Sequence, residues 1–69
     1  MKPEVGAKAT VEVLGQSVIG EVVRVSETSV WIRLHHPSGT TPTFRYTRRT
    51  NGEYRKAGAG QYAAPVLFH

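Results

Sequence analysis

Arginine and aromatic side chains concentrate in the middle of this chain, and both types can bind a ligand. Residues 31–56 hold five arginines, one lysine and the only tryptophan of the sequence. Flat aromatic rings stack on nucleic-acid bases at roughly 1 to 3 kcal/mol per base, and guanidinium groups neutralise phosphates and stack as well. This combination predicts a binding surface.

The residue types that catalysis and metal binding usually need are missing. The sequence has no cysteine and no aspartate, which removes thiol nucleophiles, zinc frameworks of the usual kind and an aspartate that could orient a histidine. His35 and His36 are adjacent, so on a strand they point in opposite directions, and His69 is terminal. We therefore expect no enzyme activity, no metal site and no cofactor.

The positive charge is confined to one half of the chain. The net charge is +4, but residues 1–30 carry three basic and four acidic side chains, a balance of −1. Residues 31–69 carry six basic side chains against one glutamate, a balance of +5. Arginine predominates there, and its planar fork suits phosphate. The clustering favours a nucleic acid, DNA or RNA, or an acidic protein surface as the partner. The alternative is a positive surface that serves only solubility.

Length and hydropathy set the class of protein. The 69 residues predict a single domain over 1–69 that buries only roughly 60% of its unfolded surface. A homo-oligomer is one way to stabilise so small a core. No apolar run is long enough to cross a bilayer, and the first ten residues lack the apolar run of a signal peptide. With no cysteine, the chain also fits a reducing compartment. We expect a cytoplasmic protein without a membrane partner.

The first third of the chain predicts two strands joined by a tight turn. Residues 5–14 alternate between apolar and polar side chains, as in a half-buried strand. Gly15-Gln16 follows, and glycine at the first central position suits a two-residue hairpin turn. Residues 17–26 carry valines on both parities, with Gly20 early in the segment. We expect a long second strand whose apolar residues change sides at a bend or bulge.

The middle of the chain predicts a strand on each side of a loop at residues 35–42. Strand alternation separates an inner from an outer face. In the first strand Val30, Ile32 and Leu34 point inward, whereas Trp31, Arg33 and His35 point outward. In the second, over 43–50, Phe44 and Tyr46 point inward, whereas Arg45, Thr47 and Arg49 point outward.

Asn51-Gly52 is a strong hairpin signal and leads into a strand at 53–56. A two-residue loop pairs Arg49 with Tyr54 and Thr47 with Lys56, which brings Tyr54 and Lys56 to the outer face. The candidate site on that face is then Trp31, Arg33, Arg45, Arg49, Tyr54 and Lys56. A register shifted by one residue would instead make Trp31 a core or interface anchor.

Two further arginines, Arg48 and Arg55, fall on the inner parity of the same hairpin. Because they cannot be buried unpaired, we expect the 43–56 hairpin to project beyond the barrel, with Glu53 as a local partner. They join the candidate binding residues, since a basic hairpin could enter a nucleic-acid groove. The alternative is a solvated hairpin tip with no ligand.

The strands together predict an all-β protein, a small antiparallel barrel of five or six strands. Closure removes edges that so short a chain could not cover. Residues 62–68, which include Pro65, add a short edge strand or a closing lid. A turn glycine, the long bent strand Gln16–Val25 and the strand Thr28–Leu34 resemble SH3-like small barrels, a group that includes Sm-like and KOW-type modules. The N-terminal helix and nucleotide-binding loops of Sm-like proteins are absent, so no family site is transferred.

Three functional hypotheses follow. The first is a non-enzymatic nucleic-acid-binding small barrel that uses the arginine-rich, Trp- and Tyr-bearing face. The alternative is a protein-interaction module that binds an acidic protein surface, such as a small phage or mobile-element inhibitor or adaptor, because Trp, Tyr and Arg are also the usual interface anchors. The third is a self-associating structural protein in which Trp31 packs against its copy.

Overall fold

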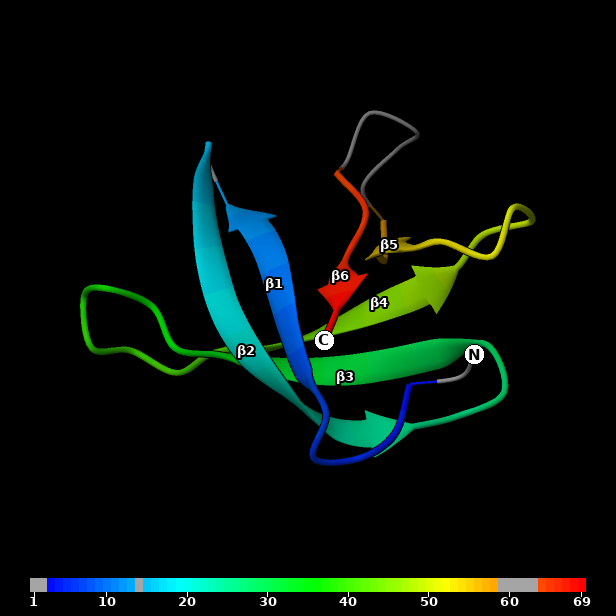
Figure 1. Ribbon diagram of the computed structural model, residues 1–69, viewed down its shortest axis with the longest axis horizontal. Helices are drawn as coiled ribbons and strands as arrows, with labels where there is room; N and C mark the ends of the chain where they lie inside the picture. The colour runs from blue at the N-terminus through cyan, green and yellow to red at the C-terminus, as the bar shows by residue number, and fades with distance from the viewer. Residues whose placement is uncertain (1–2, 14, 59–63) are drawn as a thin grey trace.

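The structure, a computed structural model, describes residues 3–13, 15–58 and 64–69. These residues form six strands: β1 (Lys8–Val13), β2 (Gln16–Val25), β3 (Ser29–Leu34), β4 (Thr43–Arg48), β5 (Tyr54–Lys56) and β6 (Leu67–Phe68). All pairings are antiparallel, and the strand order is β5-β4-β3-β2-β1-β6. The sheet curls into a half-barrel (Figure 1). The predicted all-β class is confirmed.

The apolar residues of alternating strand positions line the inside of the curled sheet. On β1, Ala9 and Val11 are buried, and the polar side chains between and beside them lie outside. β3 contributes three fully buried aliphatic residues, and β4 and β5 contribute one buried tyrosine each. The core comprises Ala9, Val11, Val18, Val22, Val30, Ile32, Leu34, Tyr46, Tyr54 and Val66. We call the opposite side of the sheet the outer face.

β2 is long because it pairs with β1 along its first part and with β3 along its second part. Val22 lies opposite Ile32, but Arg24 lies opposite Trp31, so Val23 is an extra residue in a β-bulge. The bulge turns Arg24 to the outer face, which explains the valines on both parities. Gly20 lies earlier on the strand, where a Cβ atom would stand 2.6 Å from Cγ2 of Ile32. The predicted bend or bulge is present, three residues after this glycine.

The β4–β5 hairpin differs from the predicted two-residue loop. The N–H of Arg49 donates to the carbonyl of Glu53 at 2.7 Å, and the N–H of Gly52 donates to the carbonyl of Arg49 at 2.9 Å. The loop is therefore the three residues 50–52, with Gly52 at a φ of 88°. Tyr54 consequently pairs with Arg48 instead of Arg49, and Thr47 pairs with Arg55 instead of Lys56.

This one-residue shift corrects three face assignments, because a slip by one moves every side chain of a strand to the other face. Tyr54, predicted on the outer face, is buried in the core with 7% of its surface exposed. Arg55, predicted on the inner side, lies opposite Thr47 on the outer face. Lys56 moves to the inner parity, where its ammonium lies 4.2 Å from the centroid of the Phe44 ring.

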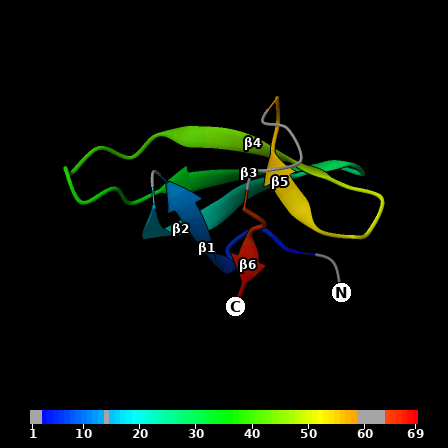
Figure 2. The same cartoon turned by 90° about the horizontal axis from the view of Figure 1, so that it is seen from above.

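The two edges of the curled sheet meet through the C-terminal segment. The N–H of Val66 donates to the carbonyl of Tyr54 at 2.8 Å, and the rings of Tyr54 and Phe68 make an edge-on contact at 5.5 Å. Figure 2 shows β5 and β6 from above. β6 is thus the short edge strand predicted for 62–68, of which residues 62 and 63 lie outside the described part. Among the described residues, no helix is long and apolar enough to span a membrane.

Candidate functional site

A row of three side chains crosses the outer face at the middle of the sheet. Trp31 on β3 lies opposite Arg24 on β2 and opposite Arg45 on β4. The sheet register itself brings these residues together, because directly opposed residues on antiparallel strands place their side chains side by side. The guanidinium carbon of Arg24 lies 4.7 Å from the centroid of the indole ring. The row is therefore an aromatic ring between two cations.

Trp31 is held in place by its neighbours along the strand. Val30 and Ile32 are fully buried with 0% exposure, so the backbone of β3 is fixed and its alternation sends the indole outward. The indole is half-buried in this position. It is not part of the aliphatic core, and the core-anchor interpretation from the sequence does not apply to the described chain.

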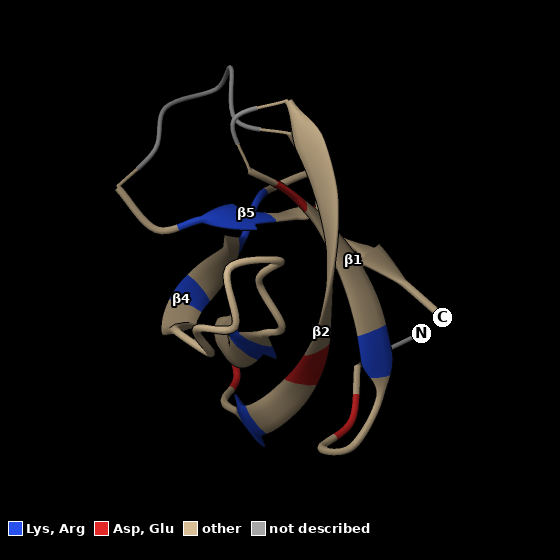
Figure 3. Ribbon diagram, turned by 90° about the vertical axis from the view of Figure 1, so that its left-hand side faces the viewer, with Lys and Arg blue, Asp and Glu red and all other residues tan. Residues whose placement is uncertain are grey.

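Arg33 enlarges the row to a patch, which we call the outer-face patch and define as Arg24, Trp31, Arg33 and Arg45. Arg33 lies opposite Thr43 on β4 and opposite Glu21 on β2. Glu21 also forms a 3.5 Å ion pair with Lys8, whose side chain is 62% exposed, so this pair contributes little stability. The glutamate limits the positive potential on the β1 side. The outer-face patch therefore lies over β2, β3 and β4, and Figure 3 shows further basic residues on β5 and β1.

Arg24 is the member of the patch that sequence reasoning missed. It belongs to the half of the chain whose net charge is −1, and strict alternation from the start of β2 does not place it beside Trp31. The sequence feature that could have predicted this placement of Arg24 is the adjacent pair Val22 and Val23, which breaks the alternation directly before the arginine. The β-bulge at Val23 is the structural form of that break.

The remaining predicted residues do not join the outer-face patch. Arg48 is exposed at the end of β4 on the parity of Tyr46, away from Trp31, and its backbone N–H donates to the carbonyl of Thr28 at 2.8 Å. Tyr54 is in the core and Lys56 covers Phe44, as described above.

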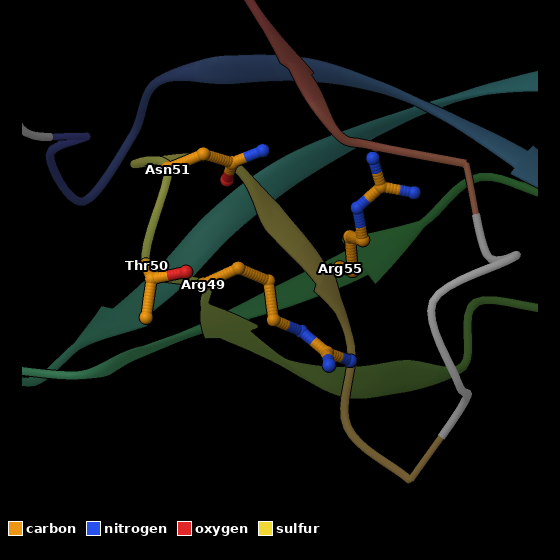
Figure 4. A pocket seen from close by; sticks show the side chains of 4 residues that line it. All are labelled: Arg49, Thr50, Asn51 and Arg55. Carbon is orange, nitrogen blue, oxygen red and sulfur yellow. The ribbon is translucent and has the colours of Figure 1, made fainter.

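Arg49 and Arg55 lie away from the outer-face patch, at the β4–β5 hairpin. With Thr50 and Asn51 they line a pocket of about 300 Å³ at the β4–β5 hairpin (Figure 4). The sequence singled out both arginines but predicted opposite faces for them. The three-residue loop is the reason that they share a pocket, because it moves Arg55 to the face of Arg49.

The loop between β3 and β4 contains hydrogen-bonded polar side chains. Nδ1 of His36 accepts from the backbone N–H of Ser38 at 3.3 Å and lies 3.0 Å from its hydroxyl, and that hydroxyl lies 3.1 Å from the hydroxyl of Thr40. Ser38 thus has a histidine partner, which sequence analysis did not foresee. Both contacts span two residues and stabilise the turn. The described residues contain no group of three or more histidine or carboxylate side chains placed to hold a metal ion.

The chain was compared with protein-family models, curated proteins and solved structures, and none of them matches it.

Proposed function

We propose that this chain is a non-enzymatic, SH3-like small barrel that binds single-stranded nucleic acid through the outer-face patch. The observation that carries the proposal is the cross-strand row Arg24–Trp31–Arg45, which places one aromatic ring between two guanidinium groups on a solvent-facing sheet. Unpaired bases expose their faces for stacking on such a ring, and the phosphates between them are neutralised by the flanking cations.

The chemistry of the row supports sequence-tolerant recognition. Every base has a face that stacks, and arginine contacts to phosphate carry no sequence information. The patch residues also lie on β-strands, so little backbone entropy is lost on binding. Single-stranded DNA and single-stranded RNA can therefore both bind to this row.

Tryptophan fluorescence tests the proposal directly, because Trp31 is the only tryptophan. Titration with single-stranded DNA and RNA oligonucleotides should quench or shift its emission. The three arginines of the patch should give a salt dependence of log K against log[salt] with a slope of about −2, since each phosphate contact on a single strand contributes about 0.7. No salt-sensitive change at low ionic strength would refute the proposal.

A matched pair of charge reversals separates the patch from general electrostatics. Arg45→Glu reverses a charge beside Trp31, and Arg48→Glu reverses an exposed charge at the other end of β4 on the opposite parity. Binding should fall at least tenfold more for Arg45→Glu, on the order of the 1.4 kcal/mol that a lost charged contact costs. Equal losses would indicate that net charge alone attracts the oligonucleotide.

A second candidate function is the binding of an acidic protein surface. The observation that favours it is an aliphatic pair on the same outer face: Ile19 and Leu67 are 61% and 59% exposed and flank Thr10 in register. Apolar, aromatic and arginine side chains on one face are typical of protein interfaces. A nuclease-treated pull-down decides between the two candidates, because a protein retained after nuclease and at high salt supports this one.

A further inference from the structure

The pocket at the β4–β5 hairpin has the composition of an oxyanion site. Arg49 and Arg55 are half-buried, whereas Thr50 and Asn51 are exposed at the loop. The lining contains two cations, one hydroxyl and one amide, and no carboxylate. Figure 4 shows Arg49 and Arg55 extending in different directions from the hairpin, and both cations add positive potential to the pocket that they line.

The hairpin already holds one oxyanion of its own. Nδ2 of Asn51 donates to Oε1 of Glu53 at 2.9 Å, and Nη2 of Arg55 donates to Oε2 of the same carboxylate at 2.9 Å. Each oxygen of the carboxylate thus accepts from a pocket-lining side chain. This contact shows that Asn51 and Arg55 are spaced to hold the two oxygens of a planar or tetrahedral oxyanion, which is the geometry that arginine recognises.

We propose that this pocket binds a phosphate monoester group, and that Glu53 is its internal competitor. A phosphate monoester presents the same pair of oxygens as a carboxylate but carries about −1.5 to −2 charges at pH 7, so it interacts more strongly with two arginines than the single charge of Glu53 does. An internal phosphodiester has one charge and chain on both sides. The larger charge of a terminal phosphate therefore favours it over an internal phosphodiester in a pocket lined by two arginines.

The source of the phosphate can be a free phosphate compound or the phosphorylated end of a polynucleotide. The second source rests on the proposed function, because the strand would lie on the outer-face patch and its end would reach the hairpin. Trp31 and Arg55 are linked across the outer face by Arg45 and Thr47, which lie on β4 opposite them. The pocket itself requires no nucleic acid.

NMR titration of the isotope-labelled protein with inorganic phosphate tests the pocket. Ionic strength is held constant by replacing chloride. We expect saturable shifts of the backbone amides of residues 50–53, and no such shifts on β1. The absence of saturation, or the same shifts with chloride alone, would overturn the proposal.

Three substitutions and a matched control sharpen this test. Glu53→Gln removes the competing charge and should strengthen phosphate binding about fivefold, the size of one interaction between unit charges about 4 Å apart in water. Arg55→Gln should abolish saturation, and Arg49→Gln should weaken it. A gain of affinity cannot arise from unfolding, so an unchanged affinity in Glu53→Gln would contradict the role of Glu53. Arg48→Gln, outside both the pocket and the outer-face patch, is the matched control and should bind phosphate as the parent does.

A pair of oligonucleotides with and without a 5′-phosphate identifies the source. Tighter binding of the phosphorylated strand, lost in Arg55→Gln and kept in Arg48→Gln, supports a polynucleotide end as the ligand. If inorganic phosphate saturates the pocket while neither strand changes Trp31 emission, the phosphate site holds and the proposed function of the outer-face patch fails. If both strands bind equally and phosphate does not saturate, the patch holds and the pocket proposal fails.

Discussion

Arg24 and Trp31 lie opposite each other across β2 and β3, with the guanidinium carbon 4.7 Å from the centroid of the indole. A cation at this distance from a tryptophan ring is attracted by the electron-rich ring face, by roughly 0.5 to 1 kcal/mol at an exposed site. The contact depends on the bulge at Val23, without which Arg24 would face the other way. One irregular residue on β2 therefore completes the outer-face patch.

The first prediction concerns this contact. A double-mutant cycle of Arg24→Gln and Trp31→Phe should show a coupling of about 0.5 kcal/mol in the free energy of unfolding, since phenylalanine binds a cation less well than tryptophan. Circular dichroism in urea measures it without the tryptophan signal. Arg33→Gln combined with Trp31→Phe is the control and should be closer to additive. A coupling of zero for the Arg24 cycle would show that the contact between Arg24 and the indole ring does not contribute to the free energy of unfolding.

The second prediction concerns Gly20. A Cβ atom at this position would lie 2.6 Å from Cγ2 of Ile32 and 2.8 Å from the carbonyl oxygen of Arg33. Gly20→Ala should destabilise the protein by about 1 to 3 kcal/mol through overpacking. Adding Ile32→Val should not restore stability, because the contact with the backbone oxygen remains. Urea denaturation compares both variants with Ser17→Ala, an exposed site on the same strand. A stable Gly20→Ala protein would contradict the close approach of β2 and β3.

The third prediction concerns Tyr54. Because this ring is buried and packs edge-on against Phe68, Tyr54→Ala should cost about 3 kcal/mol or more, enough to unfold much of so small a domain. Tyr54→Phe keeps the ring and should cost much less. Circular dichroism melting curves measure both. If Tyr54→Ala melted like the parent protein, Tyr54 would be on the outer face, as a two-residue loop requires.

The fourth prediction concerns alkaline pH. Burial raises the pKa of Tyr46 from 10.0 to about 12, because the phenolate would lose its hydration. The folded protein holds this proton more tightly than the unfolded chain does. The contribution to stability is therefore complete below pH 10 and is lost as the pH rises from 10 to 12, with a total on the order of 3 kcal/mol.

Urea unfolding across this pH range measures the effect, and Tyr46→Phe serves as the control because it lacks the titrating proton. The parent protein should lose stability more steeply than this variant does. Parallel curves for the two proteins would mean that Tyr46 titrates alike in both states. The phenolate absorbance of the folded protein offers a second measurement, since Tyr46 should ionise only near pH 12.

Some of the architecture was readable from local patterns. Alternation in residues 5–14 and 30–35 predicted the strands that the structure places at Lys8–Val13 and Ser29–Leu34, with their buried sides, because the period of a strand is two and each residue's side follows from its neighbours. The outward direction of Trp31, Arg33 and Arg45 followed from the same rule. Valines at both odd and even positions of β2 also predicted a bend or bulge in this strand, although the sequence did not show at which residue it lies.

The hairpin shows where local patterns stop. Asn51-Gly52 announces a turn, but both a two-residue and a three-residue loop can use that glycine with positive φ. The loop length is decided by contacts elsewhere in the sheet. Only the three-residue loop turns Tyr54 inward, where it contacts Phe68 and Val66 near the C-terminal end of the chain. Contacts between residues so distant in sequence cannot be predicted from the residue pattern around the turn.

The sequence by itself determined an all-strand chain, a basic second half and the outward side of β3, since these depend on residue types and on a period of two. Only the tertiary structure decided which basic residues are neighbours. Register across strands, set by one bulge and one loop residue, joined Arg24 to Trp31 and Arg49 to Arg55 and sent Tyr54 to the core. A shift of a single residue moves every side chain of a strand to the other face, and the burial of apolar surface inside the curled sheet selects the register.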